Sequence, residues 1–412
     1  MAGHVQDRWY KIDVGDDGET RKVKTDRYGT GMRYRARYVG PDGSEKSKSF
    51  PDRQKRLAEQ WLSAIEADMS RGQYIDPKTS RTTFQQYAEK WAAAQTTDLV
   101  TRDAVERRLR LHALPYLGTR PLGSFQPAHI RAWLRELENA GVPGSHAYVI
   151  YGNVRAVLSA AVDDGYLARN PCDAQSVRAP SADAKRVIPW LPERVFAVRA
   201  ALAELFRPMV DLGAGCGMRQ GEIFGLGVDG VDYGTDTVHV VRQVKLINGK
   251  PVFAPPKCDK ERDVPLPASV AATLQEHSDR HPPTAVTLPW KKPDGPMVTA
   301  RLLFTGLEGG AIRRNDFNTY SWKPALAAAG VIPERKPGER YASAREHGMH
   351  ALRHFYASVL LDAGESIRAV SDYLGHADPS LTLRVYAHLM PSSRERTRSA
   401  VDAVLGCGPA AP

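Results

Sequence analysis

The chain has 412 residues, enough for two or three domains that each bury a core of their own. Lysine and arginine together number 57 against 47 aspartate and glutamate residues, so the net charge is +10 at neutral pH. This excess favours a polyanionic partner, nucleic acid first, although a merely basic enzyme would share it.

The cysteines and the apolar segments argue against several classes of protein. The four cysteines form no CxxC pair, which speaks against a zinc site and against a disulfide framework. They are Cys172, Cys216, Cys258 and Cys407. No apolar run approaches ~18 residues, and the first residues hold no apolar signal core. We therefore expect a cytoplasmic protein without a metal, a cofactor or a membrane contact.

The first strand pattern lies at residues 32–38, which alternate with period two. One side holds the apolar residues Met32, Tyr34, Ala36 and Tyr38. The other side holds Arg33, Arg35 and Arg37. A ribbon with three arginines on one face can lie in a DNA groove, but a solvated strand face would look the same.

A turn at 41–43 leads into a second strand at 47–50, which adds Lys48 to the candidate DNA-binding residues. A helix is expected over 52–69, with one apolar stripe. The stripe consists of Leu57, Trp61, Leu62 and Ile65. Residues 1–80 are therefore predicted to form one small domain, a sheet with a helix.

Residues 81–172 are predicted to form a bundle of about four helices, because apolar residues recur there at i, i+3, i+4 and i+7. The stripes are Phe84, Tyr87, Ala88 and Trp91, then Ile130, Trp133, Leu134 and Leu137, then Val154, Val157, Leu158, Ala161 and Val162. Asn170-Pro171 is expected to end the last helix, since the residue before a proline avoids the helical region.

Residues 173–187 are polar, small and proline-containing, which predicts an extended linker. Residues 188–412 mix helix and strand signals. Helices are expected over 192–205, 208–212, 317–329, 349–362 and 366–373, and strands over 238–241, 251–253 and 263–266. The predicted fold class is thus α+β, mainly α, with a small N-terminal sheet, a helical bundle and a mixed α/β domain.

Four stretches of the last domain carry residues that can do chemistry. They are Gly217-Met218-Arg219-Gln220-Gly221-Glu222, Lys257 to Leu266, His350-Ala351-Leu352-Arg353-His354, and Leu374-Gly375-His376 followed by Tyr386. Each alone has an ordinary explanation: a surface arginine, a turn lysine, a structural His-Arg pair on one helix face, a core tyrosine. Only their order and spacing point to one site.

Taken together, these residues resemble the tyrosine recombinase family, which includes phage integrases. The pattern is Arg, Lys, His-x-x-Arg, His and Tyr, with the tyrosine ten positions after the last histidine. The resemblance covers most of the chain. Residues 1–80 resemble an arm-type DNA-binding domain, 81–172 a core-binding domain and 188–412 the catalytic domain.

The resemblance implies a role for each residue. The catalytic positions are matched by Arg219, Lys257, His350, Arg353, His376 and the nucleophile Tyr386. Glu222 and His354 match residues that support them. Lys260 is a rival for the lysine role. Lys257 is preferred, because its distance to Pro265 fits the family hairpin better. Tyr356 is a rival nucleophile, one turn past His350-x-x-Arg353 in the same helix.

These side chains suit attack on a phosphodiester. Arginine forks stabilise charge on the non-bridging oxygens, and a histidine, His350 or His376, accepts the tyrosine proton. Lys257 protonates the departing 5′-oxygen. The product would be a 3′-phosphotyrosine that stores the energy for rejoining, and the sequence has no GxxxxGK[ST] loop for ATP.

We therefore expect an enzyme that integrates or excises a phage or other mobile element. Expected partners are double-stranded attachment sites, three further copies in a tetramer on DNA, and an excisionase or a host DNA-bending factor. The location would be the nucleoid of a bacterial host, and residues 388–412 would dock on a neighbouring subunit. The alternatives are a type IB topoisomerase, a non-catalytic prophage remnant and a metal-dependent nuclease with spatially assembled carboxylates.

Overall fold

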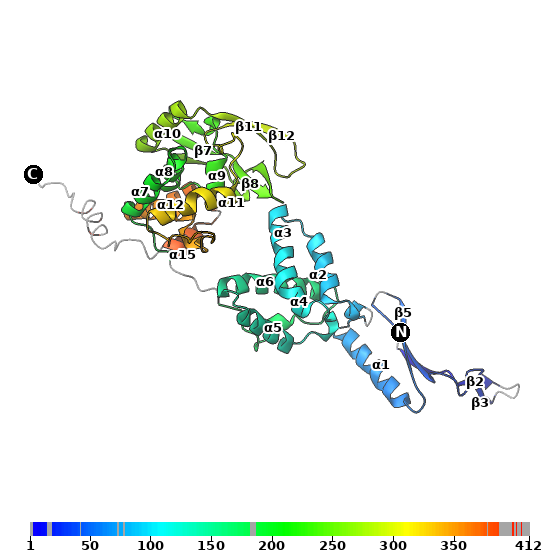
Figure 1. Ribbon diagram of the computed structural model, residues 1–412. Coiled ribbons are helices and arrows are strands. Elements are labelled where there is room, and N and C mark those ends of the chain that lie inside the picture. The colour runs from blue at the N-terminus through cyan, green and yellow to red at the C-terminus, as the bar shows by residue number, and fades with distance from the viewer. Residues whose placement is uncertain are drawn as a thin grey trace, which may run out of the picture. The chain divides into compact units, whose positions relative to one another are not determined.

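The computed structural model describes residues 3–14, 19–41, 43–71, 74–76, 79–181, 187–376 and 378–386, together with Arg398, Val401 and Leu405. The chain divides into two compact units, 1–184 and 185–412 (Figure 1). In the described part, buried hydrophobic side chains form two clusters in the first unit and one in the second. The predicted α+β class is confirmed, whereas the finer domain boundaries stay a prediction.

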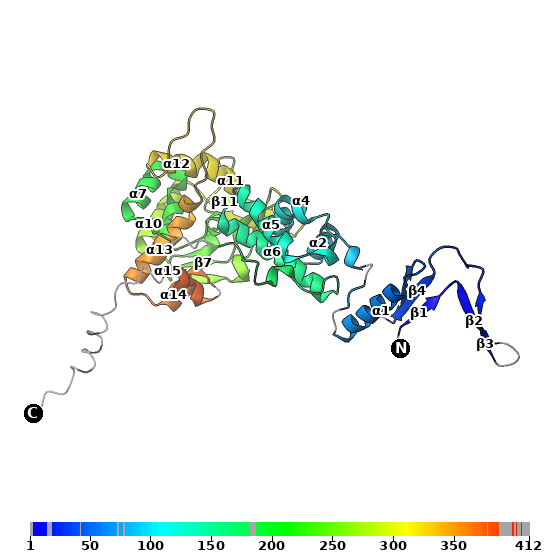
Figure 2. The same cartoon turned by 90° about the horizontal axis from the view of Figure 1, so that it is seen from below.

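The N-terminal sheet has three antiparallel strands in the order β1-β4-β5, and helix α1 covers one of its faces. A separate hairpin, β2–β3, is inserted between β1 and β4 in the chain (Figure 2). The bounds are β1 His4–Asp7, β2 Tyr10–Val14, β3 Thr20–Lys24, β4 Tyr34–Val39, β5 Glu45–Phe50 and α1 Lys55–Ser70. Strands β1 to β3 were not predicted, because their residues are mostly polar and none of them is buried.

The period-two prediction for β4 is confirmed: Tyr34, Ala36 and Tyr38 are buried against α1. The prediction of a buried apolar face is wrong for two residues, one beside β4 and one on α1. Met32 is 47% exposed because β4 begins only at Tyr34, and Leu57 is 50% exposed. The small residue Ala58 takes the buried position of α1 instead, which lets the helix backbone approach the sheet closely.

The helical bundle forms as predicted around a second core that includes Phe84, Trp133 and Ile150. Its helices are α2 Phe84–Ala93, α3 Leu99–Arg108, α4 Leu114–Leu117, α5 Pro127–Asn139 and α6 Gly144–Asp163, with a π-helical turn at Leu109–Ala113. The prediction that Asn170-Pro171 ends the last helix is wrong. Helix α6 ends at Asp163, because Gly165 (φ 74°) turns the chain and the amide of Tyr166 reaches back to the carbonyl of Ala161.

The second unit combines helices with short antiparallel sheets, and β8, β11 and β12 lie at one edge of it in Figure 1. Its helices are α7 Pro192–Ala201, α8 Arg207–Gly215, α9 Gln220–Phe224, α10 Ala268–Arg280, α11 Arg314–Phe317, α12 Lys323–Ala328, α13 His350–Asp362, α14 Ile367–Leu374 and α15 Pro379–Tyr386. Its strands are β6 Val231–Asp232, β7 Thr237–Val240, β8 Gln243–Ile247, β9 Lys250–Ala254, β10 Arg262–Pro265, β11 Thr284–Pro289 and β12 Met297–Leu302. The expected helix at 317–329 is broken by a π-helical turn at Asn318–Trp322.

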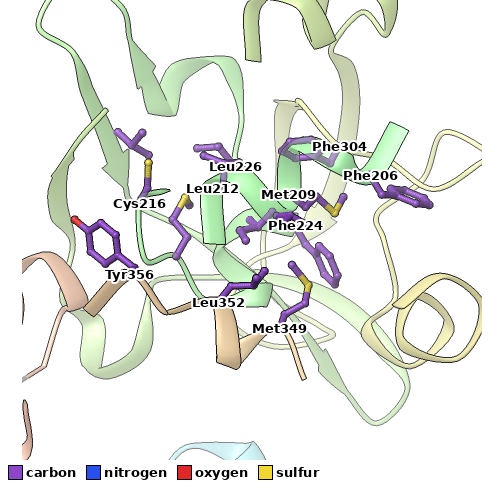
Figure 3. Close-up of a cluster of buried hydrophobic side chains, with 14 of the residues drawn as sticks. Phe206, Met209, Leu212, Cys216, Phe224, Leu226, Phe304, Met349, Leu352 and Tyr356 are labelled. Atoms are coloured by element: carbon purple, nitrogen blue, oxygen red, sulfur yellow. The ribbon is translucent and has the colours of Figure 1, made fainter. Parts of the chain in front are cut away.

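The core of the second unit ties the elements of the motifs together. Figure 3 shows Met209 and Leu212 of α8 beside Leu352 of α13, with Tyr356 near Cys216. Gly217 follows α8 with φ 61°, and a Cβ there would lie 2.4 Å from a ring carbon of Tyr356. Only glycine fits this turn, which brings the start of α9 against α13. The core therefore fixes the positions of Arg219, just after Gly217, and of Arg353, one turn before Tyr356.

Candidate functional site

A buried carboxylate organises one side of the site. Glu222, on the first turn of α9, is fully buried and accepts hydrogen bonds from two arginines. The Arg262 guanidinium donates to both Glu222 oxygens at 3.0 and 2.6 Å, and Arg219 donates at 2.8 Å through its side chain and again through its backbone amide. Burial alone would raise the pKa of Glu222, but the Arg262 hydrogen bonds and both cations lower it to about 2. The carboxylate is therefore ionised and holds Arg219 in place.

Arg353, on α13, lies at the bottom of the site and is 1% exposed. Its guanidinium donates to two backbone carbonyls, that of Gly217 at 2.7 Å and that of Leu374. Burial, together with Arg219 and Arg262, lowers the pKa of Arg353 to about 9, so it keeps its charge at neutral pH. Both of these hydrogen bonds go to carbonyls and neither to a carboxylate, and Arg219, Arg262 and Arg353 outnumber Glu222, so the site carries a net positive charge that suits an anionic ligand.

Three histidines surround Arg353. His350 and His354 lie on the same face of α13 as Arg353, at i, i+3 and i+4, and their rings meet edge-on with centroids 4.6 Å apart. His376 follows α14, and its Nδ1 lies 2.7 Å from the hydroxyl of Thr382 on α15. Burial and Arg353 lower the pKa of both His354 and His376 to about 4. These two rings are therefore neutral at pH 7.

His350 and Arg219 lie on the open side of the site. The His350 side chain is exposed, and 22% of the Arg219 side-chain surface is accessible. Arg219 also donates to the carbonyl of Gly375 at 3.4 Å, which links the start of α9 to the end of α14. A ligand that enters from solvent meets these two side chains before Arg353.

Tyr386, the last residue of α15, is 2% exposed, and its hydroxyl lies 2.6 Å from Nδ1 of His354. Burial raises the pKa of Tyr386 to about 12, although Arg353 acts in the opposite direction. The residue expected to accept the proton of this hydroxyl is His350 or His376. The structure brings His354 to it instead, a residue that the resemblance had given only a supporting place.

Tyr356 lies apart from this cluster. Its ring packs in the core beside Cys216 and over Gly217 (Figure 3), and it is 6% exposed. Burial raises its pKa far above the usual range. These contacts are those of a core tyrosine, so its surroundings favour Tyr386 as the reactive residue.

The two rival lysines lie in different surroundings. Lys260 donates to the carbonyl of His376 at 3.2 Å and lies 3.6 Å from a carboxylate oxygen of Asp372. Lys257 is exposed on the turn Lys257–Asp259 and bonds to no other residue that the structure describes. The described contacts thus bring Lys260, and not Lys257, into the cluster. A lysine on an exposed turn can still reach a ligand when the turn moves, so the assignment of Lys257 stays a prediction.

The basic residues of the N-terminal sheet do not all share one face. Arg35 and Arg37 pair with Ser49 and Ser47 on the face away from α1. Lys48 pairs with the buried Ala36, so it lies on the α1 face, where its Nζ is 5.4 Å from the centre of the Trp61 ring. Lys48 therefore does not join the arginine face, because a strand residue one position out of step points the other way.

Arg33 is already engaged within the fold. It donates to Asp7 at 2.9 Å and to Asp52 at 2.9 Å. Arg35 donates to Ser47 Oγ at 2.9 Å, and Arg37 pairs with Glu45 at 3.0 Å. Of the three arginines, Arg33 is the one with two ionic partners, and its main contribution is to join β1, β4 and the start of α1.

Two residues of the site were missed from the sequence, Arg262 and Thr382. In β10 the buried Val264 alternates with the exposed Asp263, so period two puts Arg262 on the inward side, and this signal could have found it. No comparable signal exists for Thr382, which is 1% exposed and depends on the fold to meet His376.

The described residues show neither a metal-binding cluster nor a membrane-spanning helix. They contain no group of three or more His, Cys, Asp or Glu side chains placed to hold a metal ion. None of their helices has the length and apolar character needed to cross a bilayer. The expected docking of residues 388–412 falls almost wholly outside the described part of the chain.

Comparison with known proteins gives consistent matches. The profile of the phage integrase family matches residues 196–392, and that of the phage integrase central domain matches residues 84–176. A tyrosine recombinase XerC-like protein of Caldanaerobacter subterraneus is 27% identical over 64% of this chain and 68% of its own length. The integrase of Mycobacterium phage D29 is also 27% identical, over 88% of this chain and 91% of its own.

Solved structures show the same fold. The Tn1549 transposon integrase in complex with a circular intermediate DNA has a TM-score of 0.63 at 19% identity, covering 78% of this chain and 99% of that one. A lambda integrase dimer bound to a core site has a TM-score of 0.55 at 14% identity, covering 74% and 95%. The resemblance inferred from the motifs is thereby confirmed: the chain belongs to the phage integrase family of tyrosine recombinases.

Proposed function

We propose that this protein is a site-specific DNA recombinase that cuts and rejoins DNA through a 3′-phosphotyrosyl bond to Tyr386, and so integrates or excises a mobile element. Its family is one of DNA strand transferases, and its relatives include integrases of mycobacteriophages. The observation that carries the proposal is that the hydroxyl of Tyr386 and the guanidinium of Arg353, which hydrogen-bonds two carbonyls, belong to one buried site.

The positions of the side chains, and for Lys257 the family resemblance, support the following roles. Arg219 and His350, on the open side, receive the scissile phosphate, and Arg353 stabilises the charge that develops on its non-bridging oxygens. Glu222 holds Arg219, and His376 completes the wall of the site. Lys257 protonates the 5′-oxygen as it leaves. Because the phosphotyrosine conserves the bond energy, ligation by the reverse path needs no nucleotide cofactor.

A denaturing pull-down from host cells tests the function. The protein is captured under conditions that unfold it, and the DNA that stays attached is sequenced, with a Tyr386→Phe chain as the control. We expect one or two discrete sites that disappear in the control. Scattered attachment that disappears in the control would favour topoisomerase-like nicking and closing, and attachment that persists in the control would exclude Tyr386 as the linkage.

The leaving-group role distinguishes Lys257 from Lys260. We expect Lys257→Ala to slow cleavage by about 100-fold, the usual scale of general acid catalysis. A substrate whose bridging 5′-oxygen is replaced by sulfur should restore the rate, because a thiolate leaves without a proton. Single-turnover cleavage of both substrates by Lys257→Ala and Lys260→Ala measures this. Rescue of Lys260→Ala alone would transfer the role to Lys260, whose contact with His376 would then be the productive one.

A substitution at Thr382 tests whether the cleavage rate depends on the contact between α15 and His376. We expect Thr382→Val, which is close to isosteric, to slow cleavage about tenfold, because the half-buried Nδ1 of His376 loses its partner at a cost of about 1.4 kcal/mol. Thr287→Val is the matched control, since Thr287 is an exposed threonine of β11 that hydrogen-bonds Thr299. Equal rates for both variants would show that the His376–Thr382 bond does not matter for cleavage.

The arginine face of the N-terminal sheet is proposed to bind arm-type DNA through Arg35 and Arg37. We expect Arg35→Gln and Arg37→Gln each to weaken binding to the DNA that flanks the cleavage sites, and to lower the salt slope of binding by about one. Lys55→Gln removes a charge from α1, on the other side of the sheet, and should leave the slope unchanged. A Lys55→Gln loss as large as the arginine losses would indicate attraction without a defined face.

The assembly is also a proposal. Lambda integrase, with the same fold, has been solved as a dimer on a core site and as a tetramer on a Holliday junction. By the same arrangement, four copies of this chain would exchange strands between two attachment sites. An excisionase or a host DNA-bending factor would set the direction of the reaction at the nucleoid of a bacterial host.

A further inference from the structure

The hydroxyl of Tyr386 has one hydrogen-bond partner among the described residues, the Nδ1 atom of His354 at 2.6 Å. The two rings meet edge-on, with centroids 5.6 Å apart. The other two histidines are engaged differently: His376 bonds Thr382, and His350 contacts the edge of the His354 ring. The geometry therefore distinguishes His354 from the histidines that the sequence motif singles out.

The protonation states define the direction of this hydrogen bond. Because burial raises the pKa of Tyr386 to about 12, the phenol keeps its proton at neutral pH. Because burial and Arg353 lower the pKa of His354 to about 4, its ring is neutral and one nitrogen is free to accept. The hydroxyl then donates to Nδ1, and the ring carries its own proton on Nε2.

We propose that His354 accepts the phenolic proton of Tyr386 as the tyrosine oxygen attacks the scissile phosphorus. This inference rests on the proposed function. As the Oη–P bond forms, the Oη proton moves to Nδ1, the P–O5′ bond breaks, and the 5′-oxygen takes a proton from Lys257. In ligation the 5′-hydroxyl attacks phosphorus and returns its proton to the Lys257 amine, the P–Oη bond breaks, and the imidazolium gives its proton back to the phenolate.

Binding of the DNA phosphate makes His354 a stronger base. The charged or titratable groups that face it are Arg353 and His350 on α13, Tyr386 on α15 and His376 after α14. Arg353 is the cation that disfavours a protonated His354. A phosphate seated against Arg353 offsets that repulsion, so the imidazole becomes a stronger base when the substrate is in place.

The experiment separates a proton acceptor from a residue that only positions the hydroxyl. His354→Asn keeps an oxygen close to the position of Nδ1 that can accept a hydrogen bond but cannot carry a proton. Single-turnover cleavage is measured with ordinary tyrosine at position 386 and with 3,5-difluorotyrosine there, whose phenol ionises more readily. DNA affinity and thermal unfolding are measured alongside. His239→Asn is the matched control, at a half-buried histidine of β7 paired with Asp263.

With tyrosine at 386, we expect His354→Asn to cleave about 100-fold more slowly at unchanged DNA affinity, and His239→Asn to match the unsubstituted chain. Difluorotyrosine should recover most of the His354→Asn loss, because an easily ionised phenol needs no strong acceptor. A slow variant that difluorotyrosine does not rescue, or a variant at the full rate, overturns the proposal. Failure of the unsubstituted chain to form any adduct would instead contradict the proposed function.

A second measurement keeps His354 in place, in case His354→Asn does not fold. In protein labelled with ¹⁵N-histidine, the Nδ1 resonance of His354 reports whether that nitrogen accepts a hydrogen bond. Tyr386→Phe should move it to the position of an unbonded nitrogen and leave the His239 resonances where they are. A His354 resonance that does not respond to Tyr386→Phe contradicts the proposed proton path.

Discussion

Tyr386→Phe is expected to abolish covalent attachment to DNA while leaving attachment-site binding close to that of the unsubstituted chain. Phenylalanine fills the same space in the core that Tyr386 helps to form, so the loss is confined to the hydroxyl and its bond to His354. The measurement uses a nicked substrate from which the cleaved strand diffuses away, so that the adduct accumulates and is seen on a denaturing gel. Binding is followed separately by gel shift.

The matched control is Tyr356→Phe, which removes the hydroxyl of the rival tyrosine in the same unit. Tyr356 is also buried, at 6% exposed, but its hydroxyl makes no hydrogen bond to a side chain or backbone group that the structure describes. The Tyr356→Phe variant should therefore cleave DNA at close to the rate of the unsubstituted chain. An adduct that survives in Tyr386→Phe and disappears in Tyr356→Phe would reverse the assignment of the nucleophile.

Glu222→Gln is expected to destabilise the second unit by about 3 kcal/mol or more, since it leaves the buried Arg262 without a charged partner. The loss should also slow cleavage, because Arg219 loses the carboxylate that orients it. Urea unfolding gives the free energy, and the same preparations give the cleavage rate. Glu204→Gln is the matched control: Glu204 pairs with Arg280 at the surface, and its loss should be within experimental error.

The pH dependence of the same variant has a defined sign. The pKa of Glu222 is lowered from 4.5 to about 2 in the folded chain, so its contribution to stability is complete above about pH 5 and is lost as the pH falls towards 2. The unsubstituted chain should therefore lose stability over that window more steeply than Glu222→Gln. Parallel acid limbs would mean that Glu222 is not ionised inside the fold.

Much of the site could be predicted from the sequence because its residues lie in short local motifs. His350, Arg353 and His354 share a helix face, and Glu222 lies one turn after Arg219, so helical spacing alone brings each set together. The partner of the Tyr386 hydroxyl could not be predicted, since His354 lies 32 positions away in the chain and meets it only through the packing of α13 against the later helices.

The fold was predictable where one period dominates and not where polar strands depend on pairing. Strand β4 alternates strictly, and the bundle stripes repeat at helical spacing, so both were found. Strands β1 to β3 expose most of their side chains, and their pairing comes from backbone hydrogen bonds that leave little trace in the residue types. The end of α6 was misplaced because Gly165 ends the helix before the more conspicuous Asn170-Pro171 is reached.

The buried charge of Arg353 links folding to ligand occupancy. Its guanidinium is held by two carbonyl dipoles, which orient a cation but do not cancel it. Any anion that occupies the site in the folded chain alone adds RT ln(1 + [L]/Kd) to the unfolding free energy. The enzyme without a ligand is thus the less stable form, and a bound phosphodiester raises its unfolding free energy by interacting with Arg353. The protein should therefore melt at a higher temperature and resist proteolysis better when it is bound to DNA than when it is free.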